Sequence, residues 1–103
     1  MIYYVDIDET ICDYEGPREY PLATPIGENI EKINKLYDEG HTIIYWTARG
    51  TVTGIDWHEL TGKQLNEWGV KYHDYKLGKP HYDVFICDKA INTEVFFKVN
   101  ADE

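Results

Sequence analysis

The stretch YYVDIDETICDYEGPREYP, residues 3–21, contains the pattern that decides the fold. It opens on a short run of β-branched and aromatic residues, which is typical of a buried strand over Ile2 to Ile7. Two aspartates, Asp6 and Asp8, stand where this run ends. Carboxylates so close together repel each other unless a positive group lies between them. The pattern therefore indicates a binding site at the end of a strand.

Amphipathic helices and further apolar strands follow this first strand. Apolar residues recur at helical spacing after Thr24, which can cap a helix, and Pro25, which suits a first turn, until Gly40 ends the pattern. A second helix is expected over Trp57 to Glu67. The remaining expectations are strands over 42–46, 70–72 and 84–87, an irregular loop or small hairpin over 12–22, and either a short strand or a helical turn after residue 92.

Strands that alternate with helices predict right-handed βαβ units, with helices on both faces of a parallel sheet. We therefore expect a Rossmann-like, three-layer α/β/α sandwich with a central, mainly parallel sheet. At 103 residues the chain is expected to form one domain over 1–103, without a separate lid domain. Ligands of such sheets gather at the carboxyl ends of the strands. The polar residues at the predicted strand ends are Asp6, Asp8, Thr47, Arg49 and Asp88.

Composition narrows the class of partner. Nineteen acidic and ten basic side chains give a formal charge of −9, which opposes binding to nucleic acid or to an anionic membrane. The sequence has no long apolar run and no leader pattern, so a cytoplasmic protein is expected. Cys12 and Cys87 lack the spacing of a zinc site or of a disulfide framework, which predicts reduced thiols.

The chemistry that suits these strand ends is phosphoryl transfer. A hard cation such as Mg²⁺ would offset the repulsion between the aspartates and a phosphate, so Asp6 is a candidate metal ligand and nucleophile. Asp8 would protonate the leaving oxygen and later activate water. Thr47 and neighbouring backbone N–H groups would hold the phosphoryl oxygens, while a lysine neutralises their charge. Arg49 and Arg18 are candidates for gripping a substrate from loops over the cleft.

Three segments resemble the motifs of a known family. DIDET, residues 6–10, resembles the DxDxT signature of the haloacid dehalogenase (HAD) superfamily of phosphotransferases. IIYWTARG, residues 43–50, resembles the second motif of that family, and GKPHYDVFICDKAIN, residues 78–92, resembles its third and fourth motifs combined. The resemblance covers residues 2–92 in order. It implies a capless HAD fold, similar to that of small sugar-phosphate or capsule-biosynthesis-type phosphatases.

The resemblance also implies roles for individual residues. Asp6 takes the place of the nucleophile and Asp8 that of the general acid/base, and the carbonyl of Asp8 is also a ligand of Mg²⁺. Lys79 is the better candidate for the third-motif lysine, with Lys76 as the alternative. The other implied roles are loop shaping beside the substrate by Thr10, phosphoryl binding by Thr47 and completion of the metal site by Asp88.

The expected function is a Mg²⁺-dependent phosphomonoester hydrolase that acts through an aspartyl-phosphate on a small phosphorylated metabolite. Sugar phosphates come first as substrates and nucleotides second, and transfer to an acceptor other than water stays open. The departure from the family pattern is Cys87, which stands where the first acid of a pair is usual. A thiol is a poor ligand for Mg²⁺. The alternatives to a fully active Mg²⁺-dependent enzyme are weak Mg²⁺ binding, use of Mn²⁺, or a catalytically impaired phosphate-binding or scaffold protein.

Closure of the site also follows from the resemblance. With no cap domain, the loop of residues 12–22 would be the local shield against water. Capless members of the family often close the site with a neighbouring subunit, so a homo-oligomer is compatible with this sequence.

Overall fold

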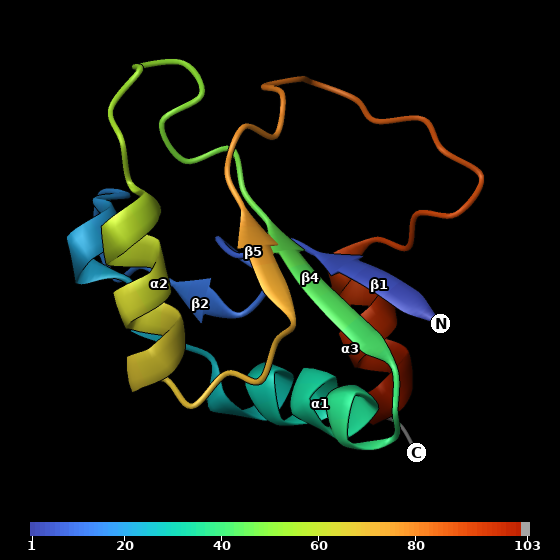
Figure 1. Ribbon diagram of the computed structural model, residues 1–103. Coiled ribbons are helices and arrows are strands. Elements are labelled where there is room, and N and C mark those ends of the chain that lie inside the picture. The colour runs from blue at the N-terminus through green and yellow to red at the C-terminus, as the bar shows by residue number, and fades with distance from the viewer. Residues whose placement is uncertain (102–103) are drawn as a thin grey trace.

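The computed structural model describes residues 1–101, with side chains through residue 98 (Figure 1). Its centre is a parallel sheet with the strand order β1-β4-β5. The elements of this αβ unit are β1 (Ile2–Val5), α1 (Gly27–Asp38), β4 (Thr42–Trp46), α2 (His58–Glu67), β5 (Asp74–Lys76) and α3 (Thr93–Ala101). The expected α/β fold with a parallel sheet is therefore confirmed.

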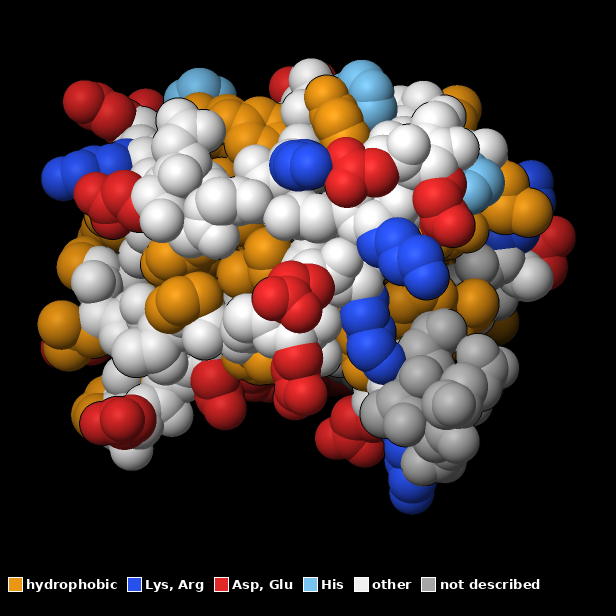
Figure 2. Space-filling model, turned by 90° about the horizontal axis from the view of Figure 1, so that it is seen from below, with side chains coloured by type: hydrophobic (Ala, Val, Ile, Leu, Met, Phe, Trp, Pro, Cys, Tyr) orange, Lys and Arg blue, Asp and Glu red, His pale blue; other side chains and the backbone are white. Residues whose placement is uncertain are grey.

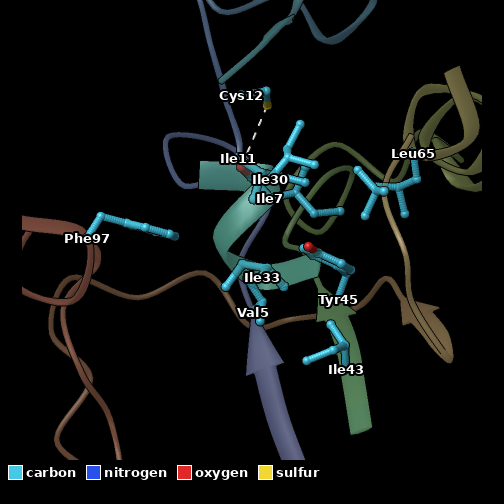
Figure 3. Packing of buried hydrophobic residues seen from close by; sticks show 11 residues of the cluster. Val5, Ile7, Ile11, Cys12, Ile30, Ile33, Ile43, Tyr45, Leu65 and Phe97 are labelled. Atoms are coloured by element: carbon cyan, nitrogen blue, oxygen red, sulfur yellow. Dashed lines mark hydrogen bonds between the residues drawn. The ribbon is translucent and has the colours of Figure 1, made fainter. Parts of the chain in front are cut away.

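One face of the sheet carries the hydrophobic core. Val5, Ile43 and Tyr45 point from β1 and β4 into a cluster that also takes Ile33 of α1 and Leu65 of α2 (Figure 3). Two right-handed crossovers that step the same way along a sheet place their helices on the same face. All three helices contribute to this one cluster, since α3 adds Phe97. The outer side of α1, seen from below, mixes acidic, basic and hydrophobic side chains (Figure 2).

The opposite face of the sheet is open. Ile2 and Tyr4 alternate with the core residues of β1, and they are 69% and 56% exposed. Ile44 and Trp46 alternate in the same way on β4 and are partly buried. The second helical layer expected from the sequence is thus not formed by the described helices, because both crossovers step from β1 toward β5 in one direction.

The segment between β1 and α1 is a small hairpin, one of the two forms expected. Strand β2 (Cys12–Asp13) pairs antiparallel with β3 (Thr24–Pro25), and the one-turn helix η1 (Tyr20–Leu22) lies between them. Because Thr24 and Pro25 belong to β3, they neither cap nor begin the helix, which starts at Gly27 after Ile26. The predicted start of this helix was wrong for that reason.

Two of the predicted strands are also wrong. The third strand of the sheet is Asp74–Lys76 rather than 70–72, because 74–76 pair with β4 while Val70 is buried in the core. Residues 84–87 form no strand. Only residues 77–83 connect them to β5, whereas a crossover between parallel strands takes about a dozen residues. After residue 92 the chain forms α3, the helical alternative.

A glycine pair gives a direct test of the loop after β4. Gly50 has a φ of +80°, and a Cβ there would collide with the backbone oxygen of Ile55. Gly54 has a φ of +77° but open space around it. We expect Gly54→Ala to cost about 1 kcal/mol of the free energy of unfolding, from the left-handed backbone alone. Gly50→Ala is expected to cost roughly 2–4 kcal/mol, because the collision adds to that strain. Urea denaturation of the two variants measures the difference, and equal losses would contradict the described loop.

Candidate active site

Asp6 lies at the carboxyl end of β1, where the chain turns sharply out of the sheet. Its Oδ1 accepts a hydrogen bond of 2.9 Å from the backbone N–H of Ile7. The N–H groups of Thr10 and Ile11 both donate to the carbonyl of Ile7, and Glu9 has a φ of +66°. A left-handed φ is uncommon for a residue with a side chain. This turn takes Asp8 out of strand geometry, as the sequence required of it.

Lys79 is the cation beside Asp6. Its Nζ lies 3.7 Å from Oδ2 of Asp6. The backbone of Lys79 is fixed to the loop after β4, because its N–H donates to the carbonyl of Thr47 and its carbonyl accepts from Oγ1 of Thr51. Lys76, the alternative from the sequence, instead has its Nζ 6.0 Å from the ring of Tyr4. Of the two lysines the structure brings Lys79 to Asp6.

Burial raises the pKa of Asp6 above its ordinary value, and the positive charge of Lys79 opposes that rise without cancelling it. The repulsion from Asp8 adds to the increase. Burial destabilises the ionised carboxylate of Asp6, and a single lysine compensates its charge. Such a carboxylate is a better nucleophile than one that is fully paired.

Asp8 has a different environment, in which Arg49 takes both of its carboxylate oxygens. Nε of Arg49 donates to Oδ2 at 3.0 Å and Nη2 donates to Oδ1 at 2.9 Å. Arg49 is only 2% exposed. Its Nη1 donates to Gln64 and Thr61 of α2, at 2.6 and 3.2 Å, and its guanidinium lies 4.8 Å from the ring centre of Tyr20. The guanidinium therefore connects Asp8 to α2 and to the hairpin.

Two further groups donate to Asp8. The hydroxyl of Tyr14 lies 2.5 Å from Oδ1, and the thiol of Cys12 lies 3.5 Å from the same oxygen. Burial would raise the pKa of Asp8, but the hydrogen bonds and charge of Arg49 and the bond from Tyr14 outweigh it and lower the pKa. Burial and the charge of Asp8 raise the pKa of the Cys12 thiol to about 12. Burial and the bond to Asp8 also raise the pKa of Tyr14. Asp8 is thus held as the ionised member of this cluster.

The lowered pKa of Asp8 predicts acid sensitivity. A group with a folded pKa below its unfolded value, about 3.9 for aspartate, stabilises the fold fully above that value, and this stability is lost as the pH falls through the folded pKa. We therefore expect the free energy of unfolding to fall more steeply in wild type than in Asp8→Asn between roughly pH 5 and pH 2. Urea titrations at a series of pH values measure both slopes. Parallel slopes would show that Asp8 is not held by Arg49.

Two small cavities meet at Asp6. The first, about 200 Å³, is bordered by both aspartates, the loop after β4 and the hairpin, and its lining includes Thr47, Arg18 and Tyr20. The second, about 240 Å³, lies on the Lys79 side and includes Pro80, His81 and Tyr82. Asp6 and Ala48 line both. A substrate that reaches Asp6 therefore has space on either side of the carboxylate.

Thr47 and Arg18 lie at this site, in different ways. Thr47 is buried at the end of β4, and its Oγ1 accepts a hydrogen bond of 3.1 Å from the N–H of Arg49. Arg18 is half exposed on the rim, where it pairs with Glu9. The rim position of Arg18 agrees with a role in substrate contact, which stays a prediction.

Arg49, Thr10 and Asp88 have different surroundings. Arg49 lines the cavity beside both aspartates, and its guanidinium bonds to Asp8, Gln64 and Thr61. Its role in gripping a substrate stays a prediction. Thr10 is buried and bonds to Oγ1 of Thr93 at 2.8 Å, which ties α3 to the turn. Asp88 lies in the exposed segment between β5 and α3, away from the two aspartates, because 84–87 do not join the sheet.

The residues that the structure brings together do not fit the expected Mg²⁺ site. The carboxylate oxygens of Asp8 face Arg49 and Tyr14, and Asp6 has Lys79 on its other side. Among the described residues, no three Asp, Glu, His or Cys side chains form a group suited to a metal ion.

The described helices include none long and apolar enough to cross a membrane.

The sequence reasoning missed the polar partners of Asp8. The sequence analysis gave neither Tyr14 nor Gln64 a part in the site. A glutamine among apolar residues at helical spacing was the visible signal, since a buried amide needs a hydrogen-bond partner. The Tyr14 contact depends on the hairpin geometry, for which residues 12–25 gave no comparable signal.

Comparison with known proteins supports the fold and gives no information on the activity. No family model matches the sequence and no curated protein matches it. A crystal structure of a structural-genomics target from Vibrio cholerae is similar, with a TM-score of 0.79 and 21% identity over 99% of this chain and 98% of that chain. At this identity the similarity concerns the fold and not the activity. The chain thus shares its α/β arrangement, over nearly its whole length, with a protein that has been crystallised.

Proposed function

We propose that the protein is a phosphomonoester hydrolase of the HAD type, capless and cytoplasmic, with Asp6 as its nucleophile. The observation that carries the proposal is the pair of Asp6 and Lys79, 3.7 Å apart, at the carboxyl end of a parallel sheet and between two cavities. The order of the DIDET, TAR and GKP segments supports it, because Asp6 and Thr47 line one cavity and Lys79 contacts both residues.

The reaction proceeds in two displacements. A carboxylate oxygen of Asp6 attacks phosphorus, the bond from phosphorus to the ester oxygen breaks, and an aspartyl-phosphate forms. Lys79 balances the charge of the transferred group, and the hydroxyl and backbone of the Thr47 loop hold its oxygens. Water then attacks phosphorus, Asp8 accepts the proton from that water, and inorganic phosphate leaves with the Asp6 carboxylate restored.

Protonation of the leaving oxygen is the step that this arrangement supports least. Arg49 and Tyr14 hold Asp8 as a carboxylate, which accepts a proton but has none to give. Esters whose leaving group needs no proton, such as aryl phosphates, should therefore react faster than sugar phosphates. Among natural substrates we place small phosphorylated sugars first and nucleotides second, as the resemblance to capless sugar-phosphate phosphatases suggests.

The test is phosphate release from p-nitrophenyl phosphate, a panel of sugar phosphates and a panel of nucleotides, each with Mg²⁺, with Mn²⁺ and with EDTA. The proposal predicts release with at least one substrate class, and fastest release from the aryl ester. Cys87→Asp restores the usual acidic pair, so a gain in that variant would show that the missing carboxylate limits turnover. The proposal would be overturned if neither wild type nor Cys87→Asp released phosphate under any of these conditions.

A second candidate, a phosphate-binding protein without turnover, is favoured by one observation. Both oxygens of Asp8 are occupied by Arg49, while Asp88 lies apart from the site. Such a protein would gain thermal stability from inorganic phosphate, and Lys79→Met would remove the gain, while neither would release phosphate from an ester. The two functions are therefore separated by turnover alone.

A further inference from the structure

The segment from residue 80 to residue 91, here called the arm, stands away from its own sheet. It bows outward beyond β1 in Figure 1. Its centre is apolar and of strand composition, yet Val84 is 74% exposed and Ile86 is 92% exposed. Among the described residues, Val84 to Ile86 form no backbone–backbone hydrogen bond with one another or with another segment. A run of exposed β-branched and aromatic residues with free backbone groups is a strand without a partner.

Both ends of the arm are fixed. Lys79 is held by Thr47 and Thr51 at one end, and Thr93 is held by Thr10 at the other. The arm is therefore an anchored loop that presents its apolar centre at a defined place, unlike a frayed terminus.

The same molecule has a free sheet edge. Among residues 1–101, β1 pairs with β4 on one side only, so its outer N–H and C=O groups have no strand partner in that part of the chain. Ile2 and Tyr4 on this strand are exposed, on the face that no described helix covers. Parallel sheets occur almost only with both faces covered. The edge and the open face thus need a cover that the described part of the chain does not supply.

The arm is badly placed to cover its own β1. The five Cα–Cα steps from Lys79 to Val84 reach about 17 Å at full extension. A strand added to the outer edge of β1 would begin two strand spacings from β4 and one strand length back from the end of β4. With spacings of about 4.8 Å and a rise of about 3.3 Å per residue, the straight-line distance from the end of β4 to that point is about 16 Å. A path around the exposed Tyr4 is longer. Docking within one chain would therefore need a connection stretched to its limit.

We propose that the cover is a second copy of this chain, with the arm of each copy added as a strand to the β1 edge of the other. Each copy carries both halves, the apolar arm and the free edge, which is what a self-complementary two-fold interface requires. The charges agree with it. Val84 to Cys87 carry no charge and Asp83 and Asp88 flank them, while the open face carries cations at Lys76 beside Tyr4 and Lys79 beside Trp46, together with Asp74.

The exchange also affects the site. In a parallel addition, the arm of one copy ends at the carboxyl end of the other copy's β1, next to Asp6. Cys87 and Asp88 then reach the two cavities from the neighbouring copy. This consequence accounts for the separation of Asp88 from Asp6 and Asp8 within one chain.

The test is the solution mass of the full chain by sedimentation equilibrium over a dilution series. Wild type is expected at twice the mass of one chain. Val84→Asp in the arm and Ile2→Asp at the edge should each weaken association by at least about 100-fold, because two buried carboxylates per dimer lose their hydration. Val52→Asp is the matched control, since Val52 is 73% exposed in the loop after β4. Circular dichroism checks that each variant stays folded, and Val84 and Ile2 are exposed enough in one chain for that.

Three outcomes would overturn the proposal. A wild type of single-chain mass at every concentration, with β1 amides protected from hydrogen exchange, would mean that the arm covers its own edge. The same mass with unprotected β1 amides would mean a different partner. An oligomer that Val84→Asp and Ile2→Asp leave intact would place the interface elsewhere. None of these readouts depends on turnover, so failure here is distinct from failure of the proposed phosphatase.

Discussion

Replacing Asp6 by asparagine is expected to remove phosphate release, by a factor on the order of 10³ or more. The carboxamide keeps the shape of Asp6 and its acceptor oxygen for the N–H of Ile7, but it has no charge with which to attack phosphorus. Phosphate release from p-nitrophenyl phosphate measures the loss. Asp13→Asn is the control, because Asp13 is exposed on β2 and bonds through its side chain to the N–H of Tyr14. Activity retained in Asp6→Asn would exclude Asp6 as the nucleophile.

The same variant is expected to be more stable than wild type. The pKa of Asp6 is raised in the folded state, so ionisation of Asp6 disfavours the fold. That cost appears as the pH rises through the unfolded pKa, about 3.9, and is complete above the folded pKa. At neutral pH the uncharged asparagine should therefore raise the melting temperature, and near pH 3 it should not. A gain at neutral pH together with lost turnover would mark Asp6 as a site that sacrifices stability for function.

The second large effect is expected at Arg49. Removing one member of a buried ion pair costs roughly 3–5 kcal/mol, because it leaves the other charge buried without compensation. Arg49→Met should have an effect of this size on the free energy of unfolding, since its side chain is fully buried and that of Asp8 is 10% exposed. Arg49→Lys keeps the charge but loses the two-point contact with Asp8. Its free energy of unfolding should therefore lie between that of wild type and that of Arg49→Met. Urea denaturation at neutral pH measures all three proteins.

A double-mutant cycle separates the ion pair from general packing. Adding Asp8→Asn to Arg49→Met should recover much of the loss, because no charge is then left unpaired. Arg18→Met is the matched control at a half-exposed pair with Glu9, where a surface salt bridge contributes about 0–1 kcal/mol. Additive losses from Asp8 and Arg49 would show that the two side chains do not act as a pair.

The parts of the fold that could be predicted from the sequence are those with a strong local pattern. The strands that contain Ile2–Val5 and Thr42–Trp46 and the helix before Gly40 are each fixed by apolar periodicity and a clear stop. Their order also predicted that Asp6, Asp8 and Thr47 would meet at one edge of the sheet, as they do. These are consequences of chain direction and pleat, which are visible in one sequence.

The wrong predictions concern pairing partners, which local pattern does not contain. Val84 to Cys87 have the composition of a buried strand, but a strand also needs a neighbour, and the connection from β5 is too short to supply one. Thr24 and Pro25 look like a helix start until Cys12 and Asp13 pair with them. The partners of Arg49 were not visible in the local pattern either, because Asp8 and Gln64 lie 41 and 15 positions away from it in the sequence. Each error arose from a contact between distant residues.

If Asp6 is the nucleophile, it carries a phosphoryl group during turnover, and chemical trapping detects that group. Wild type and Asp6→Asn would be mixed with p-nitrophenyl phosphate, quenched in acid within the first turnover, reduced with borohydride and digested for mass spectrometry. Borohydride converts an aspartyl-phosphate to homoserine, so we expect homoserine at position 6 in wild type only. Phosphate release without any modification at position 6, or homoserine at Asp8 or Asp88 instead, would contradict it.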